Sequence, residues 1–432
     1  MSALGADASK MLLKNFAEDR VVFLIFSAFL LTQLFYPFFR WVFQMVKLGP
    51  LFYIPALLAL LYSISKESYA IYSSRWSPYR AAFDLVLVLS LLVGILHTKS
   101  LVATGFGFWI LNPFFFGLAA GRILLARFEY LKFSPLILLG VIFIGLILDD
   151  IAIDFPWRGL ETEIAGTSVT VSKVWTANGV RRLSGFQSSS IESSRWILFL
   201  LVFFLLGSHK TIIKLTVTIF AFYFISLTTT KVTLLAAIPA TIILLLPERT
   251  LAYSAKTILS LFVVIGVSLP AYSFVTQWPF DIRDVQTARA LFSFEDRFSS
   301  MWPSNLEHLL EHGNILLGSG LGNFGASAIK FSSVFIPASD NIYLYVYQIA
   351  GLVGLLFFFY VLLKFLVMSF SSGFTSRFVL AFLATILIAG VTDGTFESPI
   401  SALLLGICIS QIMGTKAKTF EVEPSGDLVS QR

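Results

Sequence analysis

The chain has 432 residues, of which 57% are apolar and only 13% are charged, against roughly a quarter charged in an ordinary soluble protein. These proportions exclude a soluble enzyme or binding domain of any size, and the 45 phenylalanines suit side chains that face lipid. The net charge of +6 comes from residues scattered between apolar runs, which is not the clustered basic surface of a nucleic-acid-binding protein. The single cysteine, Cys408, excludes an internal disulfide.

Long apolar runs recur along the chain. A hydrocarbon core about 30 Å thick requires roughly 20 apolar residues in a helix. No cleavage site follows the first run, so we expect it to be retained as a helix. The sequence therefore predicts an all-α polytopic membrane protein of about twelve transmembrane helices, forming one domain over residues 1–432. The runs begin at Val21, Leu48, Ala81, Leu101, Leu131, Trp196, Thr211, Val232, Lys256, Ile342, Phe378 and Pro399.

Positive residues recur in alternate connections and in both tails, which places both termini in the cytoplasm. Arg40 and Lys47 are the exceptions. Two long connections, residues 149–194 and 277–340, then lie on the opposite side, where long loops usually carry function. The tail over residues 416–432 is polar and is expected to be cytoplasmic and disordered.

The first long connection contains an alternating stretch over residues 168–174 and then Asn178-Gly179, a pattern that predicts a β-hairpin. Arg181 and Arg182 follow directly. A guanidinium fork suits phosphate or pyrophosphate oxygens, so we expect this pair to bind a phosphorylated ligand. The alternative is that both arginines pair with Glu192 or with lipid headgroups.

The second long connection contains Arg283, Arg289 and Arg297, followed by Trp302. Ser304 and Glu307 have the spacing of a capping box, which predicts a short helix that starts there and stops at Gly313. His308 and His312 have metal-ligand spacing on that helix, but no third ligand is evident and no metal is expected.

Glycines follow at positions 318, 320, 322 and 325, and Gly320, Gly322 and Gly325 spell a dinucleotide fingerprint. That motif has meaning only within a strand–helix unit of a soluble sheet. A turn whose backbone N–H groups approach a lipid phosphate is the favoured interpretation. Asp340-Asn341 marks the return to the membrane, where Asp340 could act as a general base, cap the next helix, or do both.

Few ionisable residues fall within the predicted spans, and such residues are functional candidates because burying them in lipid is costly. They are Asp84, Lys231, Asp393 and Glu397.

The order of these motifs resembles the O-antigen polymerase and O-antigen ligase superfamily, which includes exopolysaccharide polymerases. The resemblance covers most of the chain and is best from Arg181 to Phe359. The residues that carry it are Arg181 and Arg182 before Ser184-Gly185, Thr230-Lys231, Arg297 and Trp302, Gly318 to Gly322, Asp340 to Leu344, and Gly351 to Leu355.

The resemblance implies a metal-independent enzyme without cofactors in the bacterial inner membrane. Such an enzyme transfers glycan from undecaprenyl pyrophosphate to an acceptor hydroxyl on the periplasmic face, and a chain-length regulator is a possible partner. The developing negative charge on the leaving group needs fixed cations. The expected catalytic residues are Asp340, Arg181, Arg182 and Arg297, and the expected substrate-binding residues are Lys231, Arg289, Trp302, Gly320, Gly322, Asn341 and Tyr343.

Two departures from the family pattern stand out. Ligases of the lipid A–core type usually have histidine where this chain has Asp340, which favours a polymerase of O-antigen, capsule or exopolysaccharide. The usual arginine after the Ser/Thr step is Lys231, a point charge that offers no bidentate fork. A ligase and a lipid-linked-glycan flippase or secondary transporter remain alternatives, although no motif repeats between the two halves of the chain. A peptidoglycan-type glycosyltransferase fits the loop motifs less well.

Overall fold

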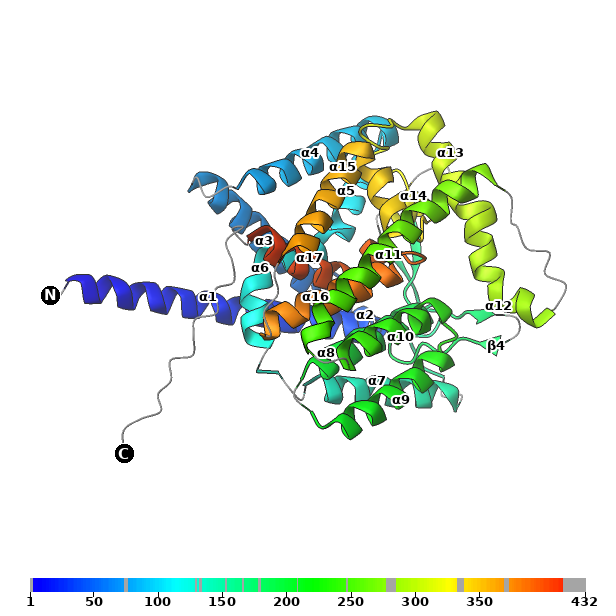
Figure 1. Cartoon of the computed structure of the whole chain (residues 1–432), viewed down its shortest axis with the longest axis horizontal. Coiled ribbons are helices and arrows are strands. Elements are labelled where there is room, and N and C mark those ends of the chain that lie inside the picture. The colour runs from blue at the N-terminus through cyan, green and yellow to red at the C-terminus, as the bar shows by residue number, and fades with distance from the viewer. Residues whose placement is uncertain are drawn as a thin grey trace.

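The structure, a computed structural model, describes residues 3–73, 77–128, 130–131, 134–151, 154–164, 167–177, 180–207, 209–245, 248–276, 285–331, 338–368 and 373–414, with side chains described except at 3–16, 164, 167, 177, 248–249 and 285–290. The described chain is mainly helical (Figure 1). Its first half contains α1 (Ala3–Leu34), α2 (Tyr36–Met45), η1 (Gly49–Tyr53), α3 (Ile54–Tyr72), α4 (Pro78–Thr98), α5 (Leu101–Ile110), α6 (Asn112–Phe128), α7 (Ser134–Asp150), β1 (Glu161–Ile164), β2 (Thr167–Thr170), β3 (Thr176–Ala177), β4 (Val180–Arg181) and α8 (Ser190–Leu206). Its second half contains α9 (Thr211–Leu227), α10 (Lys231–Leu245), α11 (Glu248–Val275), α12 (Val285–Asp296), the π-helix η2 (Arg297–Met301), α13 (Trp302–His312), α14 (Gly325–Phe331), α15 (Ile342–Val367), α16 (Phe374–Ala389), η3 (Thr395–Glu397) and α17 (Pro399–Gly414).

Several of these helices are long and apolar enough to cross a membrane. Within the described residues they number five, namely Gly49–Tyr72, Pro78–Thr98, Leu101–Phe128, Thr250–Val275 and Ile342–Val367, or six if the bent pair α1–α2 counts as one. Helices α9, α10, α16 and α17 are apolar but have only 15 to 17 residues, short of the roughly 20 that a perpendicular span requires. An all-α protein with membrane-length helices is confirmed, whereas the count of twelve is not.

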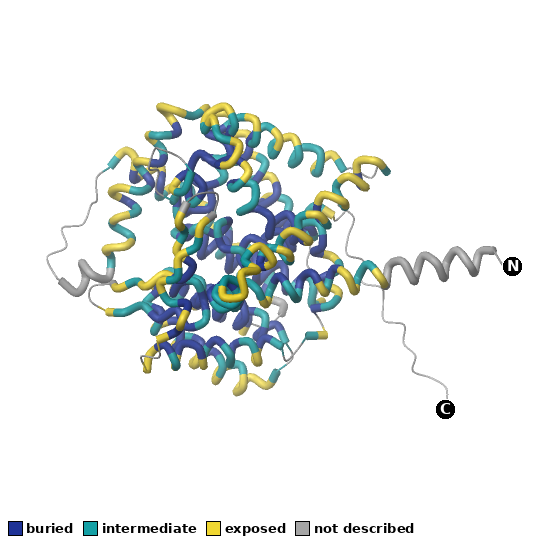
Figure 2. The backbone as a smooth tube through the Cα atoms, turned by 180° about the vertical axis from the view of Figure 1, so that it is seen from behind, coloured by how far each residue is buried: buried dark blue, intermediate teal, exposed yellow. Residues whose placement is uncertain are grey.

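Helix α17 lies within the buried core, with every residue from Ile400 to Ser410 buried, and Figure 2 shows the exposed residues gathered around this core. It packs closely against α6. A Cβ on Gly117 would collide with the carbonyl oxygen of Leu403, and one on Gly406 with that of Phe114. Small residues let two helix backbones approach, which favours dispersion contacts between membrane helices. This packing holds α17 and the turn that leads into it.

Helices α1 and α2 meet at a bend of 90°. The rings of Phe38 and Trp41 on α2 lie 5.6 and 6.2 Å from the ring of Trp157 in the first long connection. Arg40, which lies between Phe38 and Trp41 in the sequence and is 3% exposed, donates a hydrogen bond to Thr162 of β1. Arg40 is therefore a buried residue of the contact between α2 and this connection.

The first long connection contains two short antiparallel strand pairs. Strand β3 pairs with β4, with Thr176 opposite Arg181, so the residues that flank Asn178-Gly179 form the expected hairpin, while Asn178-Gly179 itself lies outside the described residues. The alternating stretch takes another partner, because β2 pairs backward with β1 through Glu161 opposite Thr170. Arg181 and Arg182 follow the hairpin as expected.

The predicted short helix of the second connection begins earlier than expected. Ser304 and Glu307 lie inside a helical segment that runs through α12, η2 and α13, and the residue before α13, Met301, is itself in the right-handed helical region with no side-chain cap. The prediction of a capping box was therefore wrong. Phe298 and Trp302 bury themselves against Leu344, and this tertiary packing extends the helix through a possible local start. The predicted stop at Gly313 is confirmed.

Candidate functional site

The boundary between the second long connection and α15 is defined by Asn341. Its side-chain oxygen accepts hydrogen bonds from the backbone nitrogens of Tyr343 and Leu344, at 3.0 and 2.8 Å. Its amide nitrogen donates to the carbonyl oxygens of Gly266 and Val391, both at 2.8 Å. Asn341 therefore caps the helix and ties three segments together, and Asp340 is not needed as a cap.

Asp340 instead faces an arginine. Nη2 of Arg297 donates a hydrogen bond to Oδ2 of Asp340 at 2.7 Å, and the two side chains are 12% and 24% exposed. Within the described part of the chain, Oδ1 of Asp340 accepts no hydrogen bond. Burial raises the pKa of the Asp340 carboxyl, and the opposing effect of Arg297 does not offset it. One carboxylate oxygen is thus fixed by the arginine and the other can accept a proton.

Arg182 lies beside this pair. Its Nη2 donates to Oγ1 of Thr230 at 3.3 Å, and its guanidinium lies 5.4 Å from the ring centre of Trp175. Burial and the nearby Arg297 lower the pKa of Arg182, and Arg182 in turn acts electrostatically on Lys231. The Nε atoms of Arg182 and Arg297 are both buried without a hydrogen-bond partner. Arg182, Lys231 and Arg297 are here named the cation cluster. Arg182 lies near enough to each of the other two for their charges to repel, and an anion would relieve that repulsion.

Arg181 is directed elsewhere. It pairs with Asp149 at the end of α7, and so does Arg158. The backbone nitrogens of Ser184 and Gly185 donate to the other oxygen of Asp149 at 2.8 and 2.9 Å. Asp149 is 1% exposed and collects these groups into an anchor for the hairpin. Arg181 and Arg182 thus contact different partners, and neither is paired with Glu192 among the described residues.

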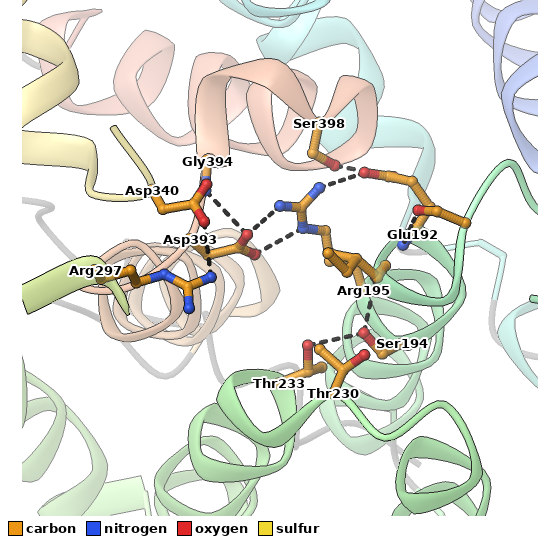
Figure 3. A network of polar contacts seen from close by, with 12 residues as sticks. Glu192, Ser194, Arg195, Thr230, Thr233, Arg297, Asp340, Asp393, Gly394 and Ser398 are labelled. Atoms are coloured by element: carbon orange, nitrogen blue, oxygen red, sulfur yellow. Dashed lines mark hydrogen bonds and ion pairs between the residues drawn. The ribbon is translucent and has the colours of Figure 1, made fainter. Parts of the chain in front are cut away.

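A second guanidinium–carboxylate pair, Arg195 and Asp393, lies next to Asp340 (Figure 3). Nε of Arg195 donates to Asp393 at 2.7 Å, Nη2 contacts the same carboxylate, and Nη1 contacts Glu192. Sequence reasoning named Asp393 but omitted Arg195, because the apolar run was taken to begin at Trp196. The signal was the i,i+3 spacing of Glu192 and Arg195 just after the Ser189 cap.

A cavity of about 1000 Å³ opens beside these pairs. Its lining includes Asp340, Asp393 and Glu397 together with Arg195. Burial raises the pKa of Glu397, which accepts a hydrogen bond from the backbone nitrogen of Ala326 at 2.8 Å. The cavity has the size of a small-molecule site, and Asp340 lies between it and Arg297.

Two aromatic residues indicated by the sequence, Trp302 and Tyr343, are buried. Trp302 is fully buried and donates from Nε1 to the carbonyl oxygen of Ser339 at 2.9 Å, which holds the residue before Asp340. Tyr343 is 2% exposed within the core, and the centre of its ring lies 6.1 Å from that of Phe358.

The side chain of Arg289, another predicted substrate-binding residue, lies outside the described residues.

The glycine run forms a turn that packs against α4 and α5. Gly320 and Gly322 have φ of +79° and +92°, conformations that favour glycine. A Cβ on Gly320 would collide with the backbone of Gly94, and one on Gly322 would lie 2.6 Å from the carbonyl carbon of Ala103. Their backbones are therefore occupied by helix packing. The expectation that Gly320 and Gly322 approach a lipid phosphate gains no support from this position.

His308 and His312 stack on each other, with ring centres 4.9 Å apart. Across the described ranges, no group of three or more His, Cys, Asp or Glu side chains is placed to hold a metal ion.

No family model, no curated protein and no solved structure matches the chain.

Proposed function

We propose that the chain is a polymerase that joins undecaprenyl-pyrophosphate-linked oligosaccharide repeat units on the periplasmic face of the bacterial inner membrane, building O-antigen, capsule or exopolysaccharide. The observation that carries the proposal is the contact between Arg297 and Asp340, with Arg182 beside it and the cavity adjoining Asp340. This arrangement supplies cations for a pyrophosphate leaving group and a carboxylate for an acceptor hydroxyl in one place.

The cation cluster would hold the donor. As the bond between the anomeric carbon and the pyrophosphate breaks, negative charge grows on the leaving oxygen, and preorganised cations stabilise it most in a site shielded from water. Arg182 and Arg297 each have a buried Nε without a partner, so each has a donor left for phosphate oxygens. Lys231 would add charge at the opening of α10.

Asp340 would act on the acceptor. The acceptor oxygen attacks the anomeric carbon, the bond to pyrophosphate breaks with its electron pair, and the hydroxyl proton passes to Oδ1 of Asp340. The hydrogen bond from Arg297 to Oδ2 fixes the orientation of the carboxylate. A carboxyl pKa raised by burial makes Asp340 a stronger base than an exposed aspartate.

The topology is part of the same proposal. About twelve spans would place both termini in the cytoplasm and residues 149–194 and 277–340 in the periplasm. The right-angled packing of α2 beneath the first connection supports this arrangement, because it removes Arg40 from the residues that contradict it. The shorter apolar helices would span the core by local thinning of the bilayer or with flanking residues.

A transporter would place its site on broken helices near mid-membrane, and α15 is broken at Gly351, where φ is +60°. The groups freed at this break are already used, because Leu352 and Val353 donate from their backbone nitrogens to the carbonyls of Ile315 and Leu316, at 2.9 and 3.1 Å. The break thus docks a loop, and it is absent from the lining of the cavity. This observation removes α15 from the case for a transporter, whereas the bent pair α1–α2 does line the cavity.

Reconstitution tests the proposal directly. Purified protein in lipid vesicles, supplied with an undecaprenyl-pyrophosphate-linked repeat unit, should produce a ladder of lipid-linked oligomers and release undecaprenyl pyrophosphate. Asp340→Asn should abolish the ladder. Asp150→Asn, at an exposed residue outside the cavity lining, is the matched control and should match the wild type. A ladder of normal length from Asp340→Asn would refute the assignment.

A further inference from the structure

The unbonded oxygen of Asp340 faces a glycine. Gly394 follows Asp393 in the turn before η3, and both residues line the cavity together with Asp340 (Figure 3). A Cβ on Gly394 would lie 3.6 Å from Oδ1 of Asp340, and no other described atom outside the adjoining residues lies within 4 Å of it. In the proposed chemistry Oδ1 receives the acceptor proton. The absence of a side chain at residue 394 therefore keeps the space beside this oxygen open.

The backbone at residue 394 does not itself require glycine. Gly394 has φ of −74° and ψ of 70°, which lie at the centre of the inverse γ-turn and are open to residues with a Cβ. An added Cβ would meet Oδ1 of Asp340 only at an ordinary van der Waals distance. Gly320 and Gly322 differ, because positive φ and close packing explain them. The effect of glycine at residue 394 is thus confined to the space beside Asp340.

Contacts from two sides hold this turn in place. On the side of α8, Nε of Arg195 donates to Asp393 at 2.7 Å, and Asp393 accepts from the backbone nitrogen of Gly394 at 2.9 Å. On the side of α15, the amide nitrogen of Asn341 donates to the carbonyl oxygen of Val391 at 2.8 Å. Asn341 directly follows the carboxylate residue in the sequence. The position of residue 394 relative to that carboxylate is therefore fixed from both sides.

Asp393 is close to Asp340 but is already engaged. Its effect on Asp340 is to raise the pKa of that carboxyl, after the larger effects of burial and of Arg297. Both oxygens of Asp393 accept hydrogen bonds, Oδ2 from Arg195 and Oδ1 from Arg195 and Gly394. Of these two carboxylates, Asp340 is the one with an oxygen left for a substrate hydroxyl.

We propose that Gly394 is a specificity-determining residue, which leaves open the path by which the acceptor hydroxyl reaches Oδ1 of Asp340 from the cavity. The proposal rests on the proposed function, because it assigns the acceptor proton to Asp340. The hydroxyl oxygen must come within about 2.7 Å of the carboxylate oxygen. The carbon that bears it would then occupy the space that a side chain at residue 394 would fill. Glycine there admits a hydroxyl on a branched carbon, such as the ring hydroxyl of a sugar.

Two substitutions narrow the opening in steps. Gly394→Ala adds one methyl group at an ordinary contact distance from Asp340, and Gly394→Val adds a branched side chain. Gly140→Ala on α7 is the matched control, because no described atom lies within 4 Å of a Cβ added there and the residue is outside the cavity lining. Thermal unfolding in detergent should be the same for Gly394→Ala and Gly140→Ala.

Access to the Asp340 carboxyl is measured without any glycan. The full chain in detergent is treated with a water-soluble carbodiimide and an amine, and the amide formed at residue 340 is followed by mass spectrometry over a range of pH. A loss of access lowers the labelling rate at every pH, whereas a change in the pKa of Asp340 shifts the profile along the pH axis. The two effects are thereby separated.

The labelling rate should fall stepwise from Gly394→Ala to Gly394→Val, by about tenfold or more in the latter, because reacting atoms must approach to about 3.5 Å. Gly140→Ala should be labelled as the wild type is. No labelling of residue 340 in the wild type, or equal rates in Gly394→Val and Gly140→Ala, would overturn the proposal.

Reconstituted extension distinguishes a failure of this proposal from a failure of the proposed function. Gly394→Ala should extend about tenfold more slowly than Gly140→Ala, since a displacement of about 1 Å at a reacting group costs up to about a hundredfold in rate. Stepwise labelling without extension by the wild type would refute the proposed function and confirm the opening. Normal extension by Gly394→Ala, with Asp340→Asn inactive, would support the proposed function and overturn the role of Gly394.

Discussion

Arg297 donates a hydrogen bond to Asp340 at 2.7 Å across 43 residues of sequence. Each residue of this pair is held in place by further contacts. Nη1 of Arg297 donates to the carbonyl oxygen of Ser293 at 2.6 Å, and Asp340 stands between Ser339, which accepts from Trp302, and the cap residue Asn341. The pair is therefore preorganised, as a site that stabilises developing charge requires.

Asp340→Asn should abolish glycan extension while the protein inserts and melts normally. Asp340 has φ of +42°, which asparagine tolerates, and Asn341 provides the cap of α15 without it. Extension would be followed by gel analysis of the polymer, and stability by thermal unfolding in detergent. An active Asp340→Asn protein would show that the carboxylate is not the base.

Replacement of the neighbouring arginines should separate their roles. Arg182→Ala and Arg297→Ala should each lower the rate of extension by about a hundredfold or more, because each removes a cation from the leaving group. Arg181→Ala should keep most of its activity and lose about 1–3 kcal/mol of stability, because buried Asp149 loses one of its donors. Equal loss of activity in all three proteins, with unchanged stability, would contradict this division.

The rate of extension should fall at low pH with a midpoint above 3.8, the ordinary value for aspartate, because burial raises the pKa of Asp340. The base works in its ionised form, so activity is lost as pH falls through that pKa. Arg297→Gln removes a group that lowers the pKa and should move the midpoint of the residual activity to higher pH. A midpoint that does not move would show that another group titrates.

The sequence predicted the helical, membrane type of the fold better than the lengths and ends of its helices. Every apolar run from Val21 to Pro399 is helical, because apolar composition suffices to indicate a membrane helix. Helix ends were harder to predict, because they depend on tertiary contacts. Ser304 could have started a helix, yet the burial of Trp302 carries the helix through that position. The 90° bend before α2 was not visible in hydropathy at all.

For the site, the sequence identified residue types but not which of them meet. Arg181 and Arg182 are adjacent in sequence and take different partners, Asp149 and Thr230, because successive residues after a strand point to opposite faces. The partner of Asp393 was missed because Arg195 stands at the edge of an apolar run. Arg40 was treated only as an exception to a topology rule, although it lines the cavity.

Gly320→Ala should strongly reduce the amount of folded protein. A Cβ there would meet the backbone of Gly94 and would also require a left-handed conformation. Gly159→Ala is the matched control, because Gly159 also has positive φ, +66°, with nothing within 4 Å of an added Cβ, and should cost only about 1 kcal/mol. Folding yield would be measured by size-exclusion chromatography. Equal yields from the two variants would show that the turn does not pack closely on α4.

The central claim is that this chain joins lipid-linked repeat units, and the lipid-linked glycan pool of cells that lack the gene tests it most directly. The account predicts single repeat units on undecaprenyl pyrophosphate at the periplasmic face, and the same pool when the gene is restored with Asp340→Asn. Long polymer stranded on the lipid would instead identify a ligase. Repeat units trapped on the cytoplasmic side would identify a flippase, and either of these two results would contradict the account.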